Sequence, residues 1–466
     1  MPDHNPRLGS GQRRWLYHRW ARMPGVLSDA LLPLATVQAA LQAEAVTFRD
    51  RVFTPVVTLY AFLGQVLDPD HSCRQTVVRV LAWLIGQGRR ACSAHTGAYC
   101  KARQRLPEGV LARLTRDTGQ QLAGRYRRRW HWHGHDVKVL DGSTVLAPDT
   151  PANQRAYPQP GTQKPGLGFP LIRMVVLFSL AVGTVLDAAY GPYQGKETAE
   201  TALWRALRHN LRPGDLLLAD RYHGSFWEVA AALARGSDVV LRVHQRRRVD
   251  FRRGRRLGRD DHLVTWTKGR RPPWMDRQTY DALPETLWVR EVRIRIPKGR
   301  CRTQEIVVVT TLLDAGRYPK GEIAALYRRR WQAELDLRAL KETMQMDFLR
   351  CRSPEMLPKE LWAHFLVYNL LRTVQAEAAA RYRRRPWQLS FQGSRQAVTA
   401  FAETWAQTPP ERWPEIYAHV LKAVVTHRVG DRPDRQEPRA RKRRRQDYPW
   451  LAEPRPQARA RLARGR

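Results

Sequence analysis

Three carboxylates occupy positions at which an α/β protein could hold metal ions. Asp141 and Asp220 each end a short apolar stretch that is predicted to be a strand, and Glu334 lies midway along a predicted helix. Strand ends are where open sheets present ligands. Two hard divalent cations need shared carboxylate oxygens, and such a pair clamps the attacking and leaving oxygens of a phosphodiester. Because aspartates at strand ends are common, the prediction of a metal-dependent site depends mostly on the surroundings of Glu334.

The surroundings of Glu334 contain the other groups that this chemistry needs. Four residues are separated by three, four and seven positions, so a single helix would carry them along one face. They are Tyr327, Arg330, Glu334 and Lys341. A face with one carboxylate among cations and an aromatic ring suits a metal ligand beside phosphate-binding groups. The alternative is a solvated face with an Arg330–Glu334 ion pair, and the spacing alone leaves both interpretations open.

The spacing of these four residues, Tyr-x2-Arg-x3-Glu-x6-Lys, matches the signature motif of the IS4-family DDE transposases at every position. The tripeptide Asp-Gly-Ser that begins at Asp141 resembles the first aspartate motif of that family. The segment Leu-Ala-Asp-Arg-Tyr around Asp220 resembles the second, and residues 98–107 resemble a segment common in the family's amino-terminal regions. The likeness covers about residues 90–375, and by it the chain is identified as a member of this family of insertion-sequence transposases.

This resemblance implies an RNase H-like catalytic core in which Asp141, Asp220 and Glu334 bind two Mg²⁺ ions, with Mn²⁺ as a substitute. The ions would activate water to nick one strand at the transposon end. They would then activate the freed 3′-hydroxyl to attack the second strand or target DNA, as in cut-and-paste transposition. The residues that the resemblance assigns to backbone phosphates near the scissile bond are Tyr327, Arg330 and Lys341.

Two tryptophans are candidates for contacts with distorted DNA. Members of the family often form a hairpin at the transposon end, which requires a base to leave the stack. Trp331 follows Arg330 and could wedge into the distorted duplex. Trp266 lies in a predicted strand of a basic segment and could stack on a flipped base. The alternative for Trp266 is core packing in a small β-layer, in which case Trp274 is the next candidate.

The composition favours a nucleic-acid partner. The 466 residues include 81 Lys and Arg against 43 Asp and Glu, which gives a formal net charge of +38. A polyanion is the expected partner of such a charge, because each neutralised phosphate releases counterions. A compositional bias towards Arg is the alternative. The five cysteines form no CxxC pair, and the longest apolar run is too short to span a bilayer. We therefore expect no membrane partner and a cytoplasmic, nucleoid-associated protein.

The pattern of apolar residues predicts an α/β fold. An all-helical region precedes an alternation of strands and helices that is typical of a mixed sheet. A β-rich insertion interrupts this core, and helices follow it. The predicted parts are a helical DNA-binding domain at 1–130, the RNase H-like catalytic core at 131–243 and 305–380, the basic β-rich insertion at 244–304, a helical region at 381–436 and a basic disordered tail at 437–466.

Individual elements follow from the same pattern. The core strands are predicted at 137–140, 171–180, 184–189, 215–220 and 238–243, with the sheet resuming at 305–312. One unbroken helix is predicted over 319–344, and another over 360–380. The wide apolar face of the second helix could bind a partner or pack on the chain's own core, and we slightly favour the core.

The resemblance also implies partners for the chain. They are transposon-end DNA with its terminal inverted repeats, target DNA, and a second copy of the chain, because cutting two ends together needs two active sites. The alternatives are a catalytically silent transposase-derived DNA-binding protein and a stand-alone RNase H-like nuclease. The complete set of carboxylates argues against the first, and the basic insertion and basic termini argue against the second.

Overall fold

The computed structural model of the chain describes residues 31–48, 51–86, 88, 91–195, 197–295, 305–430 and 449–464. Its centre is a mixed sheet of nine strands in the order β3-β2-β1-β4-β5-β9-β8-β7-β6. The strands are β1 Asp136–Leu146, β2 Leu171–Ser179, β3 Val185–Pro192, β4 Asp215–Ala219, β5 Asp238–Arg242, β6 Arg255–Gly258, β7 Asp261–Thr267, β8 Thr286–Arg295 and β9 Glu305–Thr310.

Strand β1 is the central strand of the core. It pairs antiparallel with β2 over residues 138–146 and parallel with β4 over residues 136–139. Strand β2 also pairs antiparallel with β3, and β4 pairs parallel with β5. Three antiparallel strands followed by two parallel ones form the RNase H-like arrangement that the family resemblance implies. The prediction of a mixed α/β sheet is therefore confirmed.

Continuous apolar runs explain why these segments form buried strands. Leu216, Leu217 and Leu218 of β4 are each at most 1% exposed, and the middle of β2 is equally buried. Strands covered on both faces need such runs, because neither side of the strand meets water. The strands predicted at 171–180, 215–220 and 238–243 are confirmed as β2, β4 and β5.

Strand β1 is longer than the predicted 137–140. It continues to Leu146, because β2 keeps pairing with it as far as the partners Leu146 and Leu171. Strand β4 stops pairing earlier, at Val139 and Leu218. The expectation that Asp141 ends its strand is therefore wrong. This aspartate lies within β1, just beyond the point at which β4 leaves it.

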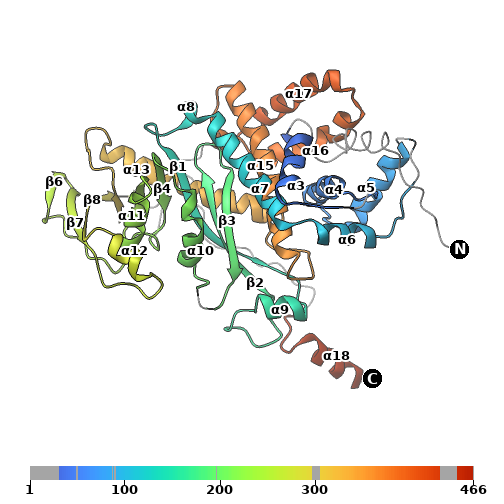
Figure 1. Cartoon of the computed structure of the whole chain (residues 1–466), viewed down its shortest axis with the longest axis horizontal. Coiled ribbons are helices and arrows are strands. Elements are labelled where there is room, and N and C mark those ends of the chain that lie inside the picture. Colours follow the sequence, from blue (N-terminus) through green and yellow to red (C-terminus); the bar gives the residue numbers. More distant parts are fainter. Residues whose placement is uncertain are drawn as a thin grey trace.

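Helices form the amino-terminal part of the chain and cover the sheet. Those that precede the sheet are α3 Leu34–Ala43, α4 Pro55–Leu67, α5 Cys73–Gly86, α6 Gly97–Arg105, α7 Glu108–Arg125 and α8 Arg127–Trp130. Those between its strands are α9 Pro151–Ala156, α10 Glu200–Leu207, α11 Phe226–Leu233 and α12 Arg277–Ala282. Those after it are α13 Lys320–Arg328, α14 Trp331–Arg338, α15 Leu357–Arg381, α16 Phe391–Gln407, α17 Trp413–Thr426 and α18 Arg455–Arg464. Figure 1 shows α3 to α6 at the end of the molecule opposite to β6, β7 and β8.

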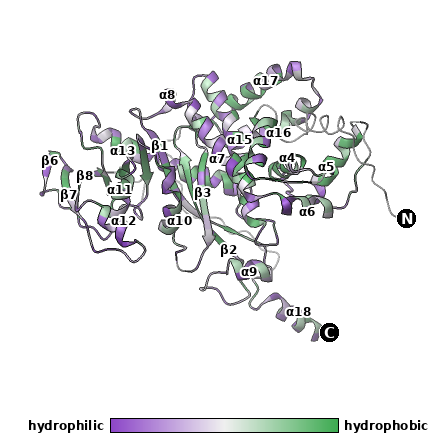
Figure 2. Cartoon of the chain, viewed as in Figure 1, coloured by the Kyte–Doolittle hydropathy of each residue, from purple (hydrophilic) through white to green (hydrophobic). Residues whose placement is uncertain are grey.

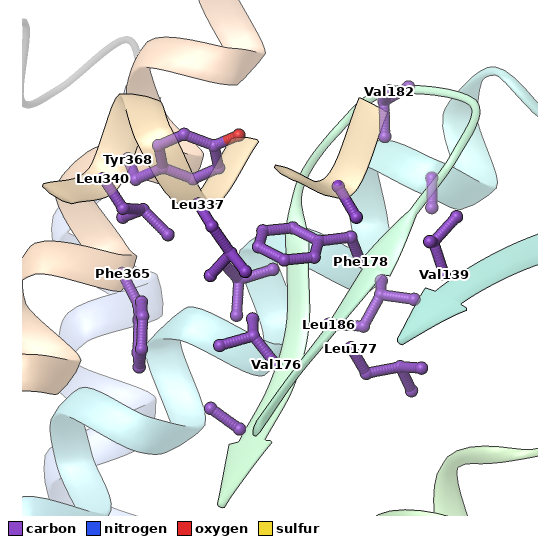
Figure 3. Packing of buried hydrophobic residues seen from close by; sticks show 14 of the residues in the cluster. Val139, Val176, Leu177, Phe178, Val182, Leu186, Leu337, Leu340, Phe365 and Tyr368 are labelled. Carbon is purple, nitrogen blue, oxygen red and sulfur yellow. The ribbon is translucent and has the colours of Figure 1, made fainter. Parts of the chain in front are cut away.

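Helix α15 joins the helical part to the sheet. It contacts α4 and α7 on the amino-terminal side, β3 of the sheet, and α16 and α17 that follow it. Figure 3 shows Phe365 and Tyr368 of this helix beside Leu337, Leu340 and Phe178, and all five residues are buried. The apolar face predicted at 360–380 therefore belongs to the chain's own core. Figure 2 shows the contrast between hydrophobic α4, which lies in this core, and hydrophilic α8.

The basic insertion continues the sheet of the core. Strand β9 pairs antiparallel with both β5 and β8, so it joins the core strands to β8, β7 and β6. The fully buried Arg290 of β8 ties the insertion to the segment before α13. Its Nε and Nη2 donate hydrogen bonds to the Asp261 carboxylate at 2.8 and 2.6 Å, and its Nη1 donates to the carbonyl of Tyr318 at 2.7 Å.

The single helix predicted over 319–344 is broken in two places. Helix α13 ends at Arg328 and α14 begins at Trp331, with Arg329 and Arg330 between them. The π-helical turn Ala339–Thr343 then replaces the last predicted turn. Because a π-turn changes the angular step from one residue to the next, Lys341 does not continue the regular helical face that begins at Tyr327.

Two further expectations bear on the surface of the chain. Within the predicted basic tail at 437–466 the structure describes residues 449–464, which include α18, a helix with no buried residue. Across the described ranges, no helix has the length and apolar character needed to cross a membrane.

The buried pair of Arg290 and Asp261 gives a stability prediction. Arg290→Ala leaves the Asp261 carboxylate buried without its partner, so we expect the free energy of unfolding to fall by about 3–5 kcal/mol. Urea unfolding followed by tryptophan fluorescence measures the change. The control is Arg277→Ala, which removes the exposed ion pair with Asp281 and should change stability little. Equal stability of the parent and Arg290→Ala would contradict the prediction.

Candidate active site

Three elements carry the predicted carboxylates. Asp141 lies in β1, Asp220 follows the last residue of β4, and Glu334 lies in the first turn of α14. Residues Val139 and Leu218 are partners in the parallel pairing of β1 and β4. The same register two residues further would place Asp141 beside Asp220, with both side chains on one face of the sheet because side chains alternate along a strand. Helix α14 contacts β1 and so brings Glu334 to the same region.

Arg330 connects two of these carboxylates. Its Nη2 donates a hydrogen bond to Oε1 of Glu334 at 2.5 Å, and its Nη1 lies 3.9 Å from Oδ1 of Asp141. One guanidinium therefore lies between a strand residue and a helix residue that are 193 positions apart in the chain. The Arg330–Glu334 ion pair that the sequence offered as the alternative to a metal site is therefore present. It is also part of the carboxylate cluster, so the two interpretations of this segment do not exclude each other.

The charges of the cluster act on one another. Burial, together with the carboxylates of Glu334 and Asp220, raises the pKa of Asp141 to about 6, although the guanidinium of Arg330 and the N–H of Gly142 act to lower it. Burial also raises the pKa of the Tyr327 hydroxyl to about 12. Carboxylates that repel one another in a partly buried site attract a cation, and Arg330 supplies that positive charge in the structure.

The donor set fits a hard divalent cation, although the present geometry does not enclose one. Carboxylate oxygens are the ligands that Mg²⁺ prefers. As the side chains stand, no three acidic, His or Cys side chains of the described residues are arranged to share one ion. The Arg330 guanidinium, which contacts both Glu334 and Asp141, lies where positive charge is needed. Arg330 therefore competes with a cation for the Glu334 carboxylate.

A groove of about 620 Å³ opens beside the cluster. Its residues come from β1, the start of β2, and the segment from α14 onward; they are Asp141, Gly142, Ser143, Thr144, Leu146, Leu171, Glu334, Leu337, Arg338, Lys341, Glu342 and Asp347. Lys341 spans this groove, since its Nζ donates a hydrogen bond to Oγ of Ser143 at 3.3 Å. The structure thus brings Asp141, Glu334 and Lys341 together around one opening, and Arg330 contacts the first two. Tyr327 is buried, and neither it nor Asp220 lines the groove.

The predicted tryptophans lie in different environments. Trp331 is 56% exposed and is available for contact with DNA. Trp266 is 1% exposed, because its Nε1 donates a hydrogen bond to Glu291 at 2.8 Å and Arg247 covers its ring at 3.9 Å. The ring of Trp266 is therefore packed in the β-layer, which is the alternative that the sequence left open. As the structure stands, it has no free face for a base.

Trp288 is an exposed ring that the sequence interpretation missed. It lies in β8 opposite Thr265 of β7, next to the strand position of Trp266, and is 59% exposed. Leu287 and Val289 on either side of it are buried. The alternation of apolar residues in β8 was the signal that could have found it, because a large aromatic ring on the outward side of such a strand is unusual.

A family model that covers more than half of the chain shows its family. Residues 132–370 match the family described as "Transposase DDE domain". Transposase InsG for insertion sequence element IS4, from Escherichia coli (strain K12), is 29% identical over 427 residues, which are 91% of this chain and 93% of that protein. The putative transposase InsL for insertion sequence element IS186A, from the same organism, is 29% identical over 185 residues, 34% of this chain and 50% of that protein. Among solved structures, the piggyBac transposase synaptic complex with hairpin DNA aligns with a TM-score of 0.39 and 9% identity, over 91% of this chain and 88% of that one.

The raised pKa of Asp141 predicts how stability depends on pH. A carboxyl whose pKa is about 6 in the folded chain and 3.8 when unfolded binds more protons in the folded state. Its contribution to stability is therefore present at low pH and is lost as the pH rises from about 4 to 6. Asp141→Asn should remove this loss and stabilise the metal-free protein at pH 8 by up to about 3 kcal/mol.

Urea unfolding of the parent and Asp141→Asn in EDTA, at pH 4.5 and pH 8, measures this effect. The gain should be about 3 kcal/mol at pH 8 and only about 1 kcal/mol at pH 4.5, because pH 4.5 lies a little above the pKa of the unfolded carboxyl and well below that of the folded one. A gain of the same size at both pH values would mean that ionisation of Asp141 is not its cause.

Proposed function

Because the chain belongs to the IS4-family DDE transposases, we propose that it cuts DNA at the ends of an insertion sequence and joins those ends to target DNA. One observation carries this proposal. The guanidinium of Arg330 contacts both Glu334 and Asp141, so the helix with the family signature meets the strand with the first aspartate. This meeting supports a shared active site, which neither motif would form alone.

We assign Asp141, Asp220 and Glu334 to the metal ions. These carboxylates would hold two Mg²⁺ ions, or Mn²⁺ as a substitute, with Asp141 between the other two by strand register and by the Arg330 contact. Bound metal of this kind supplies the positive charge that activates the attacking oxygen and stabilises the leaving one. The protein would supply the geometry, because its carboxylates are held by the sheet and by α14.

The cationic groups would bind the DNA backbone. Arg330 would exchange Glu334 for a phosphate when metal binds, since a guanidinium pairs with phosphate and carboxylate in the same two-pronged geometry. Lys341 reaches across the groove to Ser143 and would hold a second phosphate. Tyr327 is buried next to Arg330 and would limit the positions that this arginine can take.

The reaction would proceed in two steps of the same kind. In the first, a water oxygen attacks the phosphorus at the element end, and the bond from phosphorus to the 3′ oxygen breaks. This leaves a 3′-hydroxyl on one fragment and a 5′-phosphate on the other. In the second, that 3′-hydroxyl attacks another phosphodiester, so one P–O bond forms as one breaks and no energy source is needed.

The surface of the insertion and the start of α14 would contact the distorted DNA end. Trp331 is an exposed ring three residues before Glu334, and Trp288 is an exposed ring of the insertion. We assign Trp331 the role of a wedge beside the scissile phosphate. Trp274, the next candidate from the sequence, lies under the guanidinium groups of Arg205 and Arg208, which are 4.4 and 5.6 Å from its ring centre. We therefore assign the stacking role to the exposed Trp288. Two copies of the chain would hold two terminal inverted repeats and the target, at the nucleoid.

Removal of any one carboxylate tests the proposed catalysis. Asp141→Asn, Asp220→Asn and Glu334→Gln should each reduce nicking of labelled element-end DNA in Mg²⁺ by at least about 100-fold, because each removes a metal ligand. DNA binding should stay within about twofold, because the basic surface is unchanged. Glu355→Gln, an exposed carboxylate outside the groove, is the control and should nick like the parent. Nicking near the parental rate by any of the three variants would show that the triad is misassigned.

The role of Lys341 gives a second test of DNA contact. Lys341→Ala should lower the slope of log affinity against log salt by about 0.9, because one phosphate contact is lost. Lys341→Arg keeps the charge and should keep the slope. Fluorescence anisotropy with element-end DNA at several salt concentrations measures both values. Equal slopes for the parent and Lys341→Ala would exclude Lys341 as a phosphate ligand.

A further inference from the structure

A fourth carboxylate lies against the first aspartate motif. A Cβ atom at Gly142 would lie 2.5 Å from Cδ of Glu200 and 2.7 and 2.8 Å from its two carboxylate oxygens. At these distances a side chain at position 142 would displace the end of the Glu200 side chain, so the carboxyl group of Glu200 occupies the space that the glycine leaves. Glu200 is the first residue of α10, and α10 packs on β2 and β3. Helix α10 therefore brings Glu200 to β1, and none of the three predicted carboxylates lies in this helix.

Glu200 is close enough to the cluster to share its electrostatics. Burial raises its pKa, and the charge of Asp220 raises it further, while the charge of Arg173 lowers it. Asp220 in turn raises the pKa of Asp141. Glu200, Asp220 and Asp141 thus form a continuous series of like charges, which ends at Glu334 on the other side.

The backbone just before Glu200 is fixed by Arg173. Nη1 of Arg173 in β2 donates a hydrogen bond to the carbonyl of Thr198 at 2.9 Å, two residues before Glu200. The guanidinium of Arg173 also lies 4.4 Å from the centre of the Tyr193 ring, in the same connection between β3 and α10. Among the residues that the structure describes, none forms a hydrogen bond or an ion pair with the Glu200 carboxylate. The side chain is therefore positioned beside the site with its oxygens uncommitted to a described neighbour.

We propose that Glu200 is a fourth carboxylate of the active site and binds the metal ion on the α10 side of Asp220. This assignment rests on the proposed function, because it needs the metal site made by Asp141, Asp220 and Glu334. It also explains Gly142, since any larger residue there would push the Glu200 carboxyl away from the cluster.

The competing explanation is a structural one. A carboxylate in the first turn of a helix interacts favourably with the helix dipole, and this alone would account for a glutamate at the start of α10. The two explanations differ in what a change at Glu200 alters. The structural role alters only the stability of the protein, whereas the proposed role alters its affinity for a divalent ion.

The test is the affinity of the full-length protein for Mn²⁺, measured by electron paramagnetic resonance of the free ion. Glu200→Gln should weaken the binding by at least about tenfold. Glu200→Asp should weaken it nearly as much, because it keeps the charge but shortens the reach. Gly142→Ala should reproduce the loss, and the double variant Gly142→Ala/Glu200→Gln should lose no more than either single change. Glu197→Gln, an exposed glutamate in the same connection, should bind like the parent.

The outcomes separate this assignment from the proposed function. Parental affinity in Glu200→Gln, together with a loss in Asp220→Asn, would overturn the fourth ligand and leave the triad standing. Parental affinity in Glu200→Asp with a loss in Glu200→Gln would overturn direct binding, because charge alone would then suffice. A parent that binds no Mn²⁺ would overturn both. A lower melting temperature of Glu200→Gln with unchanged Mn²⁺ affinity would leave only the structural explanation.

Discussion

Mutual repulsion of carboxylates is the constraint that the architecture of this molecule has to overcome. Asp141, Asp220 and Glu334 lie close enough for two of them to raise the pKa of the third. They stay together because apolar strands on both sides of β1 and the buried helix α15 fix the elements that carry them. Arg330 supplies the positive charge that offsets part of this repulsion, which is the role proposed for the metal ions.

The sequence predicts the sheet well and supplies the candidate site residues, because both depend on local signals. Buried strands are continuous apolar runs, and the spacing of Tyr327, Arg330, Glu334 and Lys341 is a family signature. What could not be predicted depends on neighbours that are distant in the chain. The extension of β1 past Asp141 is caused by β2, and the breaks around α14 place Arg330 between two carboxylates rather than on a regular face. The distances between the triad carboxylates and their binding of metal remain predictions.

The tryptophans show the same limit on a smaller scale. Trp266 and Trp288 belong to adjacent paired strands, yet one ring is buried under Arg247 and the other is exposed. Composition cannot separate them, because both lie in a basic segment with β-like alternation. Only the side of the sheet to which each strand position points decides which ring meets solvent. Glu200 escaped notice for a related reason, since its significance depends on contact with Gly142, 58 positions earlier.

The pairing of β9 with strands on both of its sides fixes the position of the insertion relative to the core. Strand β9 pairs with β5 of the core and β8 of the insertion, and the buried Arg290 adds a bond from β8 to the segment before α13. The insertion therefore cannot swing as a separate lobe unless a ladder of backbone hydrogen bonds breaks. A DNA end that touches both the insertion and the carboxylates has to bend to match the protein, so the cost of distortion falls on the nucleic acid and sequences that bend easily are favoured.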